Sequence, residues 1–127
     1  MPDYTVHKPK VNLTLAADAT EESITGTSLT QVKDMSFIKG VFNAKQLTIE
    51  IELKTDNASN PAICRVRHDG LGTDDLVLQT SSTAYIILDG TIDVSLFSSG
   101  RHTIEFLLED GSGETATMRE TWVYGRE

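Results

Sequence analysis

The strongest constraint on the fold is an alternation of apolar and polar residues with a period of two. In QLTIEIELK, residues 46–54, Leu47, Ile49, Ile51 and Leu53 alternate with polar or charged residues. This spacing is typical of a β-strand that has one buried face and one solvent-exposed face. The sequence therefore predicts a half-buried strand here.

Two further segments repeat this pattern. AICRVRH places Ala62, Cys64 and Val66 on one side, and HTIEFLLE does the same with Ile104, Phe106 and Leu108. We expect all six side chains to point into the core. LVLQT, AYIIL, TIDVSLF and ETATMRETWVYG complete the predicted strands of the second half.

Turn-forming residues punctuate these strands. DNASNP, DGLGTDD, SSG and DGSG each interrupt the apolar pattern, and Asp89-Gly90 is a typical two-residue type I′ hairpin signal. No segment sustains the period of a helix. The pattern predicts an all-β fold, an antiparallel β-sandwich.

The first forty residues are less regular. VNLTL is expected to form one strand, and residues 23–40 either a strand pair or one long bent strand. We expect residues 1–10 to be an extended N-terminal arm and residues 11–127 to be a single sandwich domain. An ordered arm would lie on a partner, whereas the alternative is a frayed terminus. The partner-binding candidates in the arm are Tyr4, Val6, His7, Lys8 and Lys10.

Bulk composition limits the classes of partner. The 127 residues fit one domain, and 19 acidic against 11 basic side chains give a net charge of −8. Nucleic acids and anionic membranes bind basic faces, so neither is expected as a partner. Cys64 is the only cysteine, which excludes an intramolecular disulfide and suits folding in the cytoplasm. No apolar run resembles a signal peptide or a membrane span.

No catalytic constellation is visible. The histidines are His7, His68 and His102, and on a strand His102 and Glu105 would point to opposite faces. Nucleophile, zinc and phosphate-loop motifs are absent from the sequence. We therefore expect no catalytic residues, no cofactor and no enzymatic activity, with Cys64 a small apolar core residue.

One loop carries a candidate metal site. Asp69, Asp74 and Asp75 surround two glycines, and calcium takes oxygen ligands from such loops. The alternative is that aspartate and glycine serve here only as turn formers.

The charged residues on predicted outer faces have a structural reading and a functional one. If the strands around Glu50 and Arg65 are neighbours, Glu50 and Glu52 form a cross-strand charge ladder with Arg65 and Arg67. The alternative is a charged docking patch. Glu120 interrupts the inward pattern of the last strand, and we expect a β-bulge to turn it outward.

Aromatic residues suggest a second kind of site. Tyr85, Trp122 and Tyr124 are candidates for stacking on a glycan, and Trp122 and Tyr124 share one face of the final strand. The alternative is that Trp122 caps the core near the sheet edge.

Residues 80–125, TSSTAYIILDGTIDVSLFSSGRHTIEFLLEDGSGETATMRETWVYG, carry a family resemblance. The Ser/Thr-rich turn, the strand ending in Asp-Gly, TIDVS, the glycine turn and the closing WVY resemble small jelly-roll virion proteins of tailed bacteriophages. They are also similar to carbohydrate-binding modules of the β-sandwich kind. The resemblance extends over residues 46–125.

The resemblance implies a jelly-roll-like sandwich and a non-enzymatic structural role in a virion. The expected function is capsid decoration, with capsid or other virion proteins as partners, in a homo-oligomer for which a trimer is favoured. The protein would be made in the host cytoplasm and located in the virion. The alternative function is a carbohydrate-binding module or a tail-fibre adhesion domain.

Overall fold

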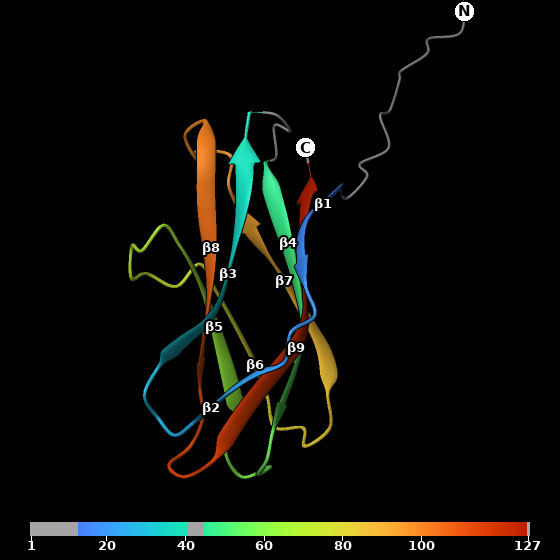
Figure 1. Ribbon diagram of the computed structural model, residues 1–127, viewed down its shortest axis with the longest axis vertical. Coiled ribbons are helices and arrows are strands. Elements are labelled where there is room, and N and C mark those ends of the chain that lie inside the picture. Colours follow the sequence, from blue (N-terminus) through green and yellow to red (C-terminus); the bar gives the residue numbers. More distant parts are fainter. Residues whose placement is uncertain (1–12, 41–44, 127) are drawn as a thin grey trace, which may run out of the picture.

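The computed structural model describes residues 13–40 and 45–126. These ranges contain β-strands and no helix, hence no helix that could cross a membrane. Figure 1 shows the strands, with β9 running the length of the molecule. Their bounds are β1 (Leu13–Asp18), β2 (Glu22–Thr25), β3 (Thr30–Lys39), β4 (Gln46–Thr55), β5 (Ala62–His68), β6 (Leu76–Thr80), β7 (Ile86–Asp93), β8 (Gly100–Glu109) and β9 (Thr115–Arg126).

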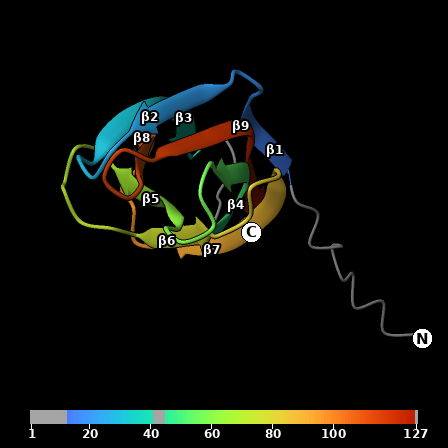
Figure 2. The same cartoon turned by 90° about the horizontal axis from the view of Figure 1, so that it is seen from below.

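The strands form two antiparallel sheets. Sheet A has the order β1-β9-β4-β7, with β2 also paired to β9, and sheet B has the order β3-β8-β5-β6. Figure 2 shows the strands arranged around a common interior. The predicted all-β antiparallel sandwich is therefore confirmed.

The predicted inward residues form the core. The four aliphatic side chains of β4 are fully buried. In β8, the exposed fraction of Ile104, Phe106 and Leu108 is at most 1%. Burying one such side chain contributes roughly 1.5–3 kcal/mol. Cys64 is also fully buried in this core, and burial raises the pKa of its thiol to about 12. The prediction that Cys64 is a core residue is confirmed.

Strand β3 places two lysines inward. Its buried positions are Lys33, Met35, Phe37 and Lys39, so the strand carries an ammonium group near each end of its core-facing side. The Lys39 Nζ donates hydrogen bonds to the carbonyl oxygens of Val94 and Ser95. The polar ends of both lysines are thus satisfied by protein oxygens, as buried charges require.

The predicted hairpin turn at Asp89-Gly90 is wrong. Both residues lie inside β7 and pair with Glu50 and Ile49 of β4. A Cβ atom on Gly90 would lie 2.6 Å from Cδ1 of Leu76, in β6 of the other sheet. The glycine is therefore explained by a close approach between the two sheets, which a local turn signal cannot distinguish from a hairpin.

The predicted charge ladder is also wrong, because its two strands belong to different sheets. β4 lies in sheet A and β5 in sheet B, so their outward side chains face away from each other. Glu52 pairs instead with Arg119 at 2.6 Å.

The irregular N-terminal region resolves into separate strands. VNLTL overlaps β1, and residues 23–40 cover most of β2 and all of β3, which pair with strands of different sheets. The expected arm, residues 1–10, lies outside the described residues.

Candidate functional site

A bulge in β9 decides which side chains reach the outer face of sheet A. The pairing with β4 shifts between Ile51, opposite Thr121, and Leu53, opposite Met118. Met118 is buried on one side of the shift and Thr121 on the other. The inward positions therefore change from even to odd numbers. The predicted bulge that turns Glu120 outward is confirmed.

Lys33 holds this bulge from inside the sandwich. Its Nζ donates hydrogen bonds to the carbonyl oxygen of Arg119 at 2.6 Å and to that of Asp18 at 3.1 Å. It also reaches the hydroxyl of Thr121 at 3.3 Å. Burial lowers the pKa of Lys33, and the Asp18 carboxylate at 3.7 Å opposes that effect. One buried ammonium group thus links β3 to the irregular part of β9.

The register after the bulge places both Trp122 and Tyr124 on the outer face. Their ring planes are nearly parallel, at 6°, and the ring centroids are 6.0 Å apart. They pair in register with Glu50 and Thr48 of β4. Trp122 is therefore on the outer surface of the sheet, and the alternative that it caps the core is wrong.

A shallow hollow of about 220 Å³ lies beside Trp122. It is smaller than the 300–1,000 Å³ typical of sites for drug-sized ligands, so it has room for one small group. Burial and the nearby Glu50 raise the pKa of the Tyr124 phenol, which keeps that hydroxyl protonated. The hollow is lined by Glu50, Ile51, Glu52, Ile87, Glu120 and Trp122.

Tyr85, the third predicted stacking residue, is already engaged by other side chains. The guanidinium carbon of Arg119 is 3.9 Å from its ring centroid, and the Nζ of Lys54 is 4.6 Å from it. Its hydroxyl donates a hydrogen bond to Glu21 at 2.9 Å. Burial is the larger cause and the Glu21 carboxylate the smaller cause that raise the pKa of Tyr85 to about 12. Tyr85 therefore does not extend the stacked pair.

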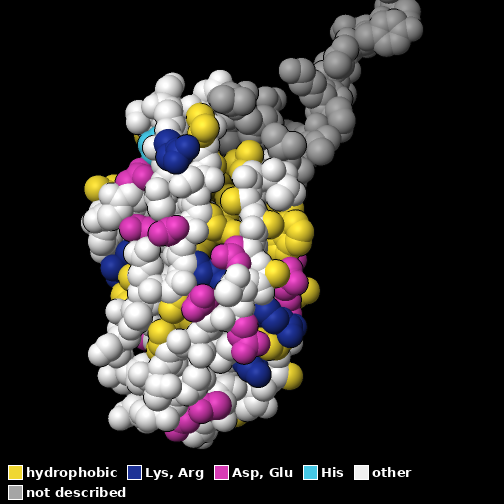
Figure 3. Space-filling model, viewed as in Figure 1, with side chains coloured by type: hydrophobic (Ala, Val, Ile, Leu, Met, Phe, Trp, Pro, Cys, Tyr) yellow, Lys and Arg dark blue, Asp and Glu magenta, His cyan; other side chains and the backbone are white. Residues whose placement is uncertain are grey.

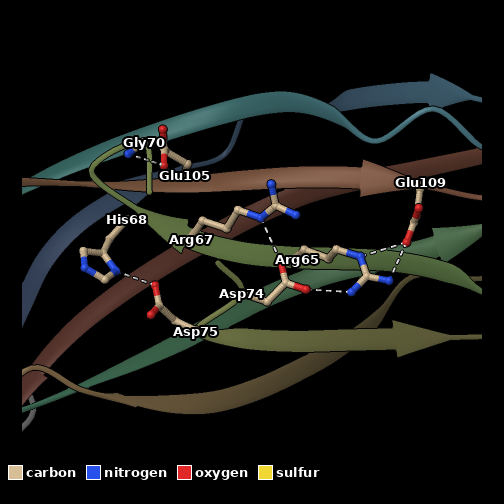
Figure 4. Close-up of polar contacts among 8 residues, drawn as sticks. All are labelled: Arg65, Arg67, His68, Gly70, Asp74, Asp75, Glu105 and Glu109. Carbon is tan, nitrogen blue, oxygen red and sulfur yellow. Dashed lines mark hydrogen bonds and ion pairs between the residues drawn. The ribbon is translucent and has the colours of Figure 1, made fainter. Parts of the chain in front are cut away.

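The outer face of sheet B carries a charge network instead of aromatic rings. Arg65 contacts Asp74 at 2.7 Å and Glu109 at 2.8 Å, and Arg67 contacts Asp74 at 2.8 Å (Figure 4). These guanidinium groups hold the pKa of Asp74 below its usual value. These ion pairs link β5 to the end of β8 and to the loop before β6.

The aspartates of the predicted calcium loop are spread over different partners. Asp74 binds the two arginines, Asp75 contacts His68 at 2.6 Å, and Asp69 contacts His102 at 2.6 Å. Within residues 13–40 and 45–126, no three His, Cys, Asp or Glu side chains are placed to hold a metal ion. The three aspartates of this loop are therefore each in contact with basic side chains of the protein.

The mixed charge of the surface is visible in Figure 3. Acidic and basic side chains lie near one another across the middle and lower parts of that face. The partner candidates Tyr4, Val6, His7, Lys8 and Lys10 lie outside the described residues.

No family model and no curated protein matches the sequence, whereas several solved structures are similar to this chain. A CBM4 carbohydrate-binding module is 15% identical, with a TM-score of 0.58 over 91% of this chain and 78% of that chain. The CBM36-1 domain of a multidomain xylanase from the hindgut metagenome of Trinervitermes trinervoides is 11% identical, with a TM-score of 0.53 over 82% and 96%. The EclA C-terminal domain, a sugar-binding protein, is 11% identical, with a TM-score of 0.55 over 97% and 88%.

The chain shares the β-sandwich fold of carbohydrate-binding modules. At these identities the likeness concerns the fold alone. Nothing in the comparisons supports the expected bacteriophage virion protein.

Sequence reasoning found the aromatic pair and missed the hollow beside it. Trp122 and Tyr124 were recognised by their spacing along one strand. The neighbouring Glu50 was assigned to an outer face, but its position beside Trp122 depends on pairing between strands about seventy residues apart. No local pattern in the sequence encodes that register.

Proposed function

We propose that this protein is a non-catalytic carbohydrate-binding module whose binding face is the outer surface of sheet A. The observation that carries the proposal is the parallel pair of Trp122 and Tyr124 beside a hollow lined by carboxylates. This was the alternative function in the sequence analysis.

The chemistry of this face suits a sugar. The face of an aromatic ring is electron-rich and attracts the C–H groups on one side of a pyranose ring. Carboxylates such as Glu50 and Glu120 accept hydrogen bonds from hydroxyl groups. The site therefore combines an apolar platform with polar acceptors, as small-molecule sites usually do.

The shared fold gives independent support. Two of the structural neighbours are described as carbohydrate-binding modules and a third as a sugar-binding protein. The comparisons favour this function over capsid decoration, for which they offer no support.

The proposal is tested by binding to an array of immobilised glycans. The wild-type protein should bind at least one glycan, and Trp122→Ala should weaken that binding by about tenfold or more, because it removes the stacking surface. Leu96→Ala is the matched control, since Leu96 is a large apolar side chain that is 97% exposed in a turn outside the proposed site. Retention of no glycan by the wild type, or equal binding by Trp122→Ala, would contradict the proposal.

A further inference from the structure

The hollow beside Trp122 carries more negative charge than its own surroundings neutralise. Glu50, Glu52 and Glu120 line it, and none of its lining residues is basic. Glu52 is paired with Arg119. Among residues 13–40 and 45–126, Glu50 and Glu120 form no ion pair.

A fourth carboxylate increases this excess. Asp89 of β7 lies directly opposite Glu50 of β4, and residues opposite each other point to the same side of the sheet. Like charges in such a pair destabilise a sheet. Lys33 attracts Glu120 from below, but its ammonium is bonded to backbone oxygens in the interior and does not line the hollow.

The outer face of sheet B pairs part of its acids with arginines. There, Arg65 and Arg67 share Asp74. Asp34 and Glu105 of the same face lie opposite each other and form no ion pair among the described residues. On sheet A, the uncompensated acids surround an aromatic ring instead. An aromatic face and nearby carboxylates are the two features that attract an organic cation.

We infer that the hollow between Trp122, Glu50 and Glu120 binds a protonated amino group on a sugar, so that the module selects amino sugars over neutral and anionic ones. This inference rests on the proposed function. The sugar ring stacks on Trp122, and its ammonium group donates charge-assisted hydrogen bonds to Glu50 and Glu120. A uronic acid or a sulfated sugar is repelled by the same carboxylates.

The test compares three β-1,4-linked tetrasaccharides by titration calorimetry. The probes are a glucosamine tetramer, its N-acetylated counterpart and cellotetraose, which differ only at the 2-substituent. The glucosamine tetramer should bind about tenfold more tightly than cellotetraose, the equivalent of one hydrogen bond to a charged group. Raising the ionic strength from about 0.01 M to about 1 M shortens the Debye length from about 30 Å to about 3 Å and should reduce this ratio.

Charge-removing variants locate the selectivity. Glu50→Gln and Glu120→Gln should each bring the affinity ratio toward one. Asp34→Asn is the matched control, because Asp34 is an exposed acid of β3 in the other sheet, and it should leave the ratio at about ten.

The outcomes separate this inference from the function it rests on. A ratio near one in the wild type, with cellotetraose still bound through Trp122, overturns amino-sugar selection and leaves the proposed function standing. A ratio that stays at about ten in both glutamine variants also overturns it. If none of the three probes binds, amino-sugar selection is wrong, and the glycan array with Trp122→Ala then decides the proposed function by itself.

Discussion

Both ring nitrogens of His102 face oxygen acceptors. Nδ1 lies 2.6 Å from a carboxylate oxygen of Asp69, and Nε2 lies 2.7 Å from the carbonyl oxygen of Ser98. Only the doubly protonated imidazolium can donate to both. Asp69 accordingly raises the pKa of His102. The pair connects the loop after β5 to β8, and the Ser98 contact adds the turn before β8.

The pH dependence of folding should report this pair. Because the pKa of His102 is raised from 6.5, its contribution to the free energy of unfolding is complete below about pH 6.5 and is lost as the pH rises through the folded value. The pKa of Asp69 is lowered, so its contribution is present above its ordinary value of 3.8 and is lost as the pH falls through the folded value. Urea unfolding at a series of pH values measures both effects.

Asp69→Asn isolates the contact. Asp69 has a φ of 50°, and asparagine tolerates that left-handed conformation well. We expect the free energy of unfolding of the variant at pH 6 to be about 1 kcal/mol lower than that of the wild type. Above pH 6, the stability of the variant should no longer fall as the pH rises. An unchanged pH profile would show that this pair does not control the titration.

At the scale of single elements, alternation in the sequence was a reliable guide, and turn chemistry was correct between strands but wrong at Asp89-Gly90. The aliphatic residues of β4 and β8 point inward as predicted, because a period of two admits only one buried face. The turn prediction at Asp89-Gly90 was wrong because a glycine that is needed to make room for Leu76 cannot be told from a turn glycine in the sequence. The β9 bulge was predictable from Glu120, but the buried Lys33 that holds it was not, since lysine is rarely buried.

Lys33 should position the aromatic pair, and Lys33→Met tests this. The variant removes the ammonium but keeps an unbranched side chain. The carbonyl oxygen of Arg119 loses its shorter hydrogen bond and keeps the one from the Thr121 hydroxyl. We expect a loss of about 1–3 kcal/mol in the free energy of unfolding together with a change in the emission spectrum of Trp122, the only tryptophan.

Lys39→Met is the matched control for this prediction. It also deletes an inward ammonium of β3, but that group binds Val94 and Ser95. It should reduce stability and leave the Trp122 spectrum as in the wild type. Equal spectral changes in both variants would argue against a specific link between Lys33 and the bulge.

At the scale of the whole molecule, the two outer faces carry different side chains. Arg65 and Arg67 of sheet B form a charge network with nearby acids, whereas sheet A presents aromatic rings beside acids that form no ion pair among the described residues. This division was not predictable from the sequence, because it depends on which distant strands share a sheet. The pairing of β4 with β9, and not with β5, placed Glu50 beside Trp122 and removed it from Arg65.

Arg65→Met should therefore separate stability from binding. All three guanidinium nitrogens of Arg65 contact Asp74 or Glu109, and methionine keeps most of the apolar stem. We expect unfolding to become easier by about 1 kcal/mol, with glycan affinity within about twofold of wild type, because RT ln 2 is well under 1 kcal/mol. Denaturant titration and calorimetry on the same sample measure the two quantities. A folded variant that no longer bound glycan would refute the separation.

The inward lysines of β3 affect how the edge of sheet B can pair with another copy of the protein. β3 is an outermost strand of sheet B, and such strands can template the addition of a strand from another copy. Continuing the sheet past β3 would require an added strand to pack against Lys33 and Lys39 in place of apolar side chains, which opposes the addition. The two inward ammonium groups of β3 therefore also oppose strand addition from another copy at high protein concentration.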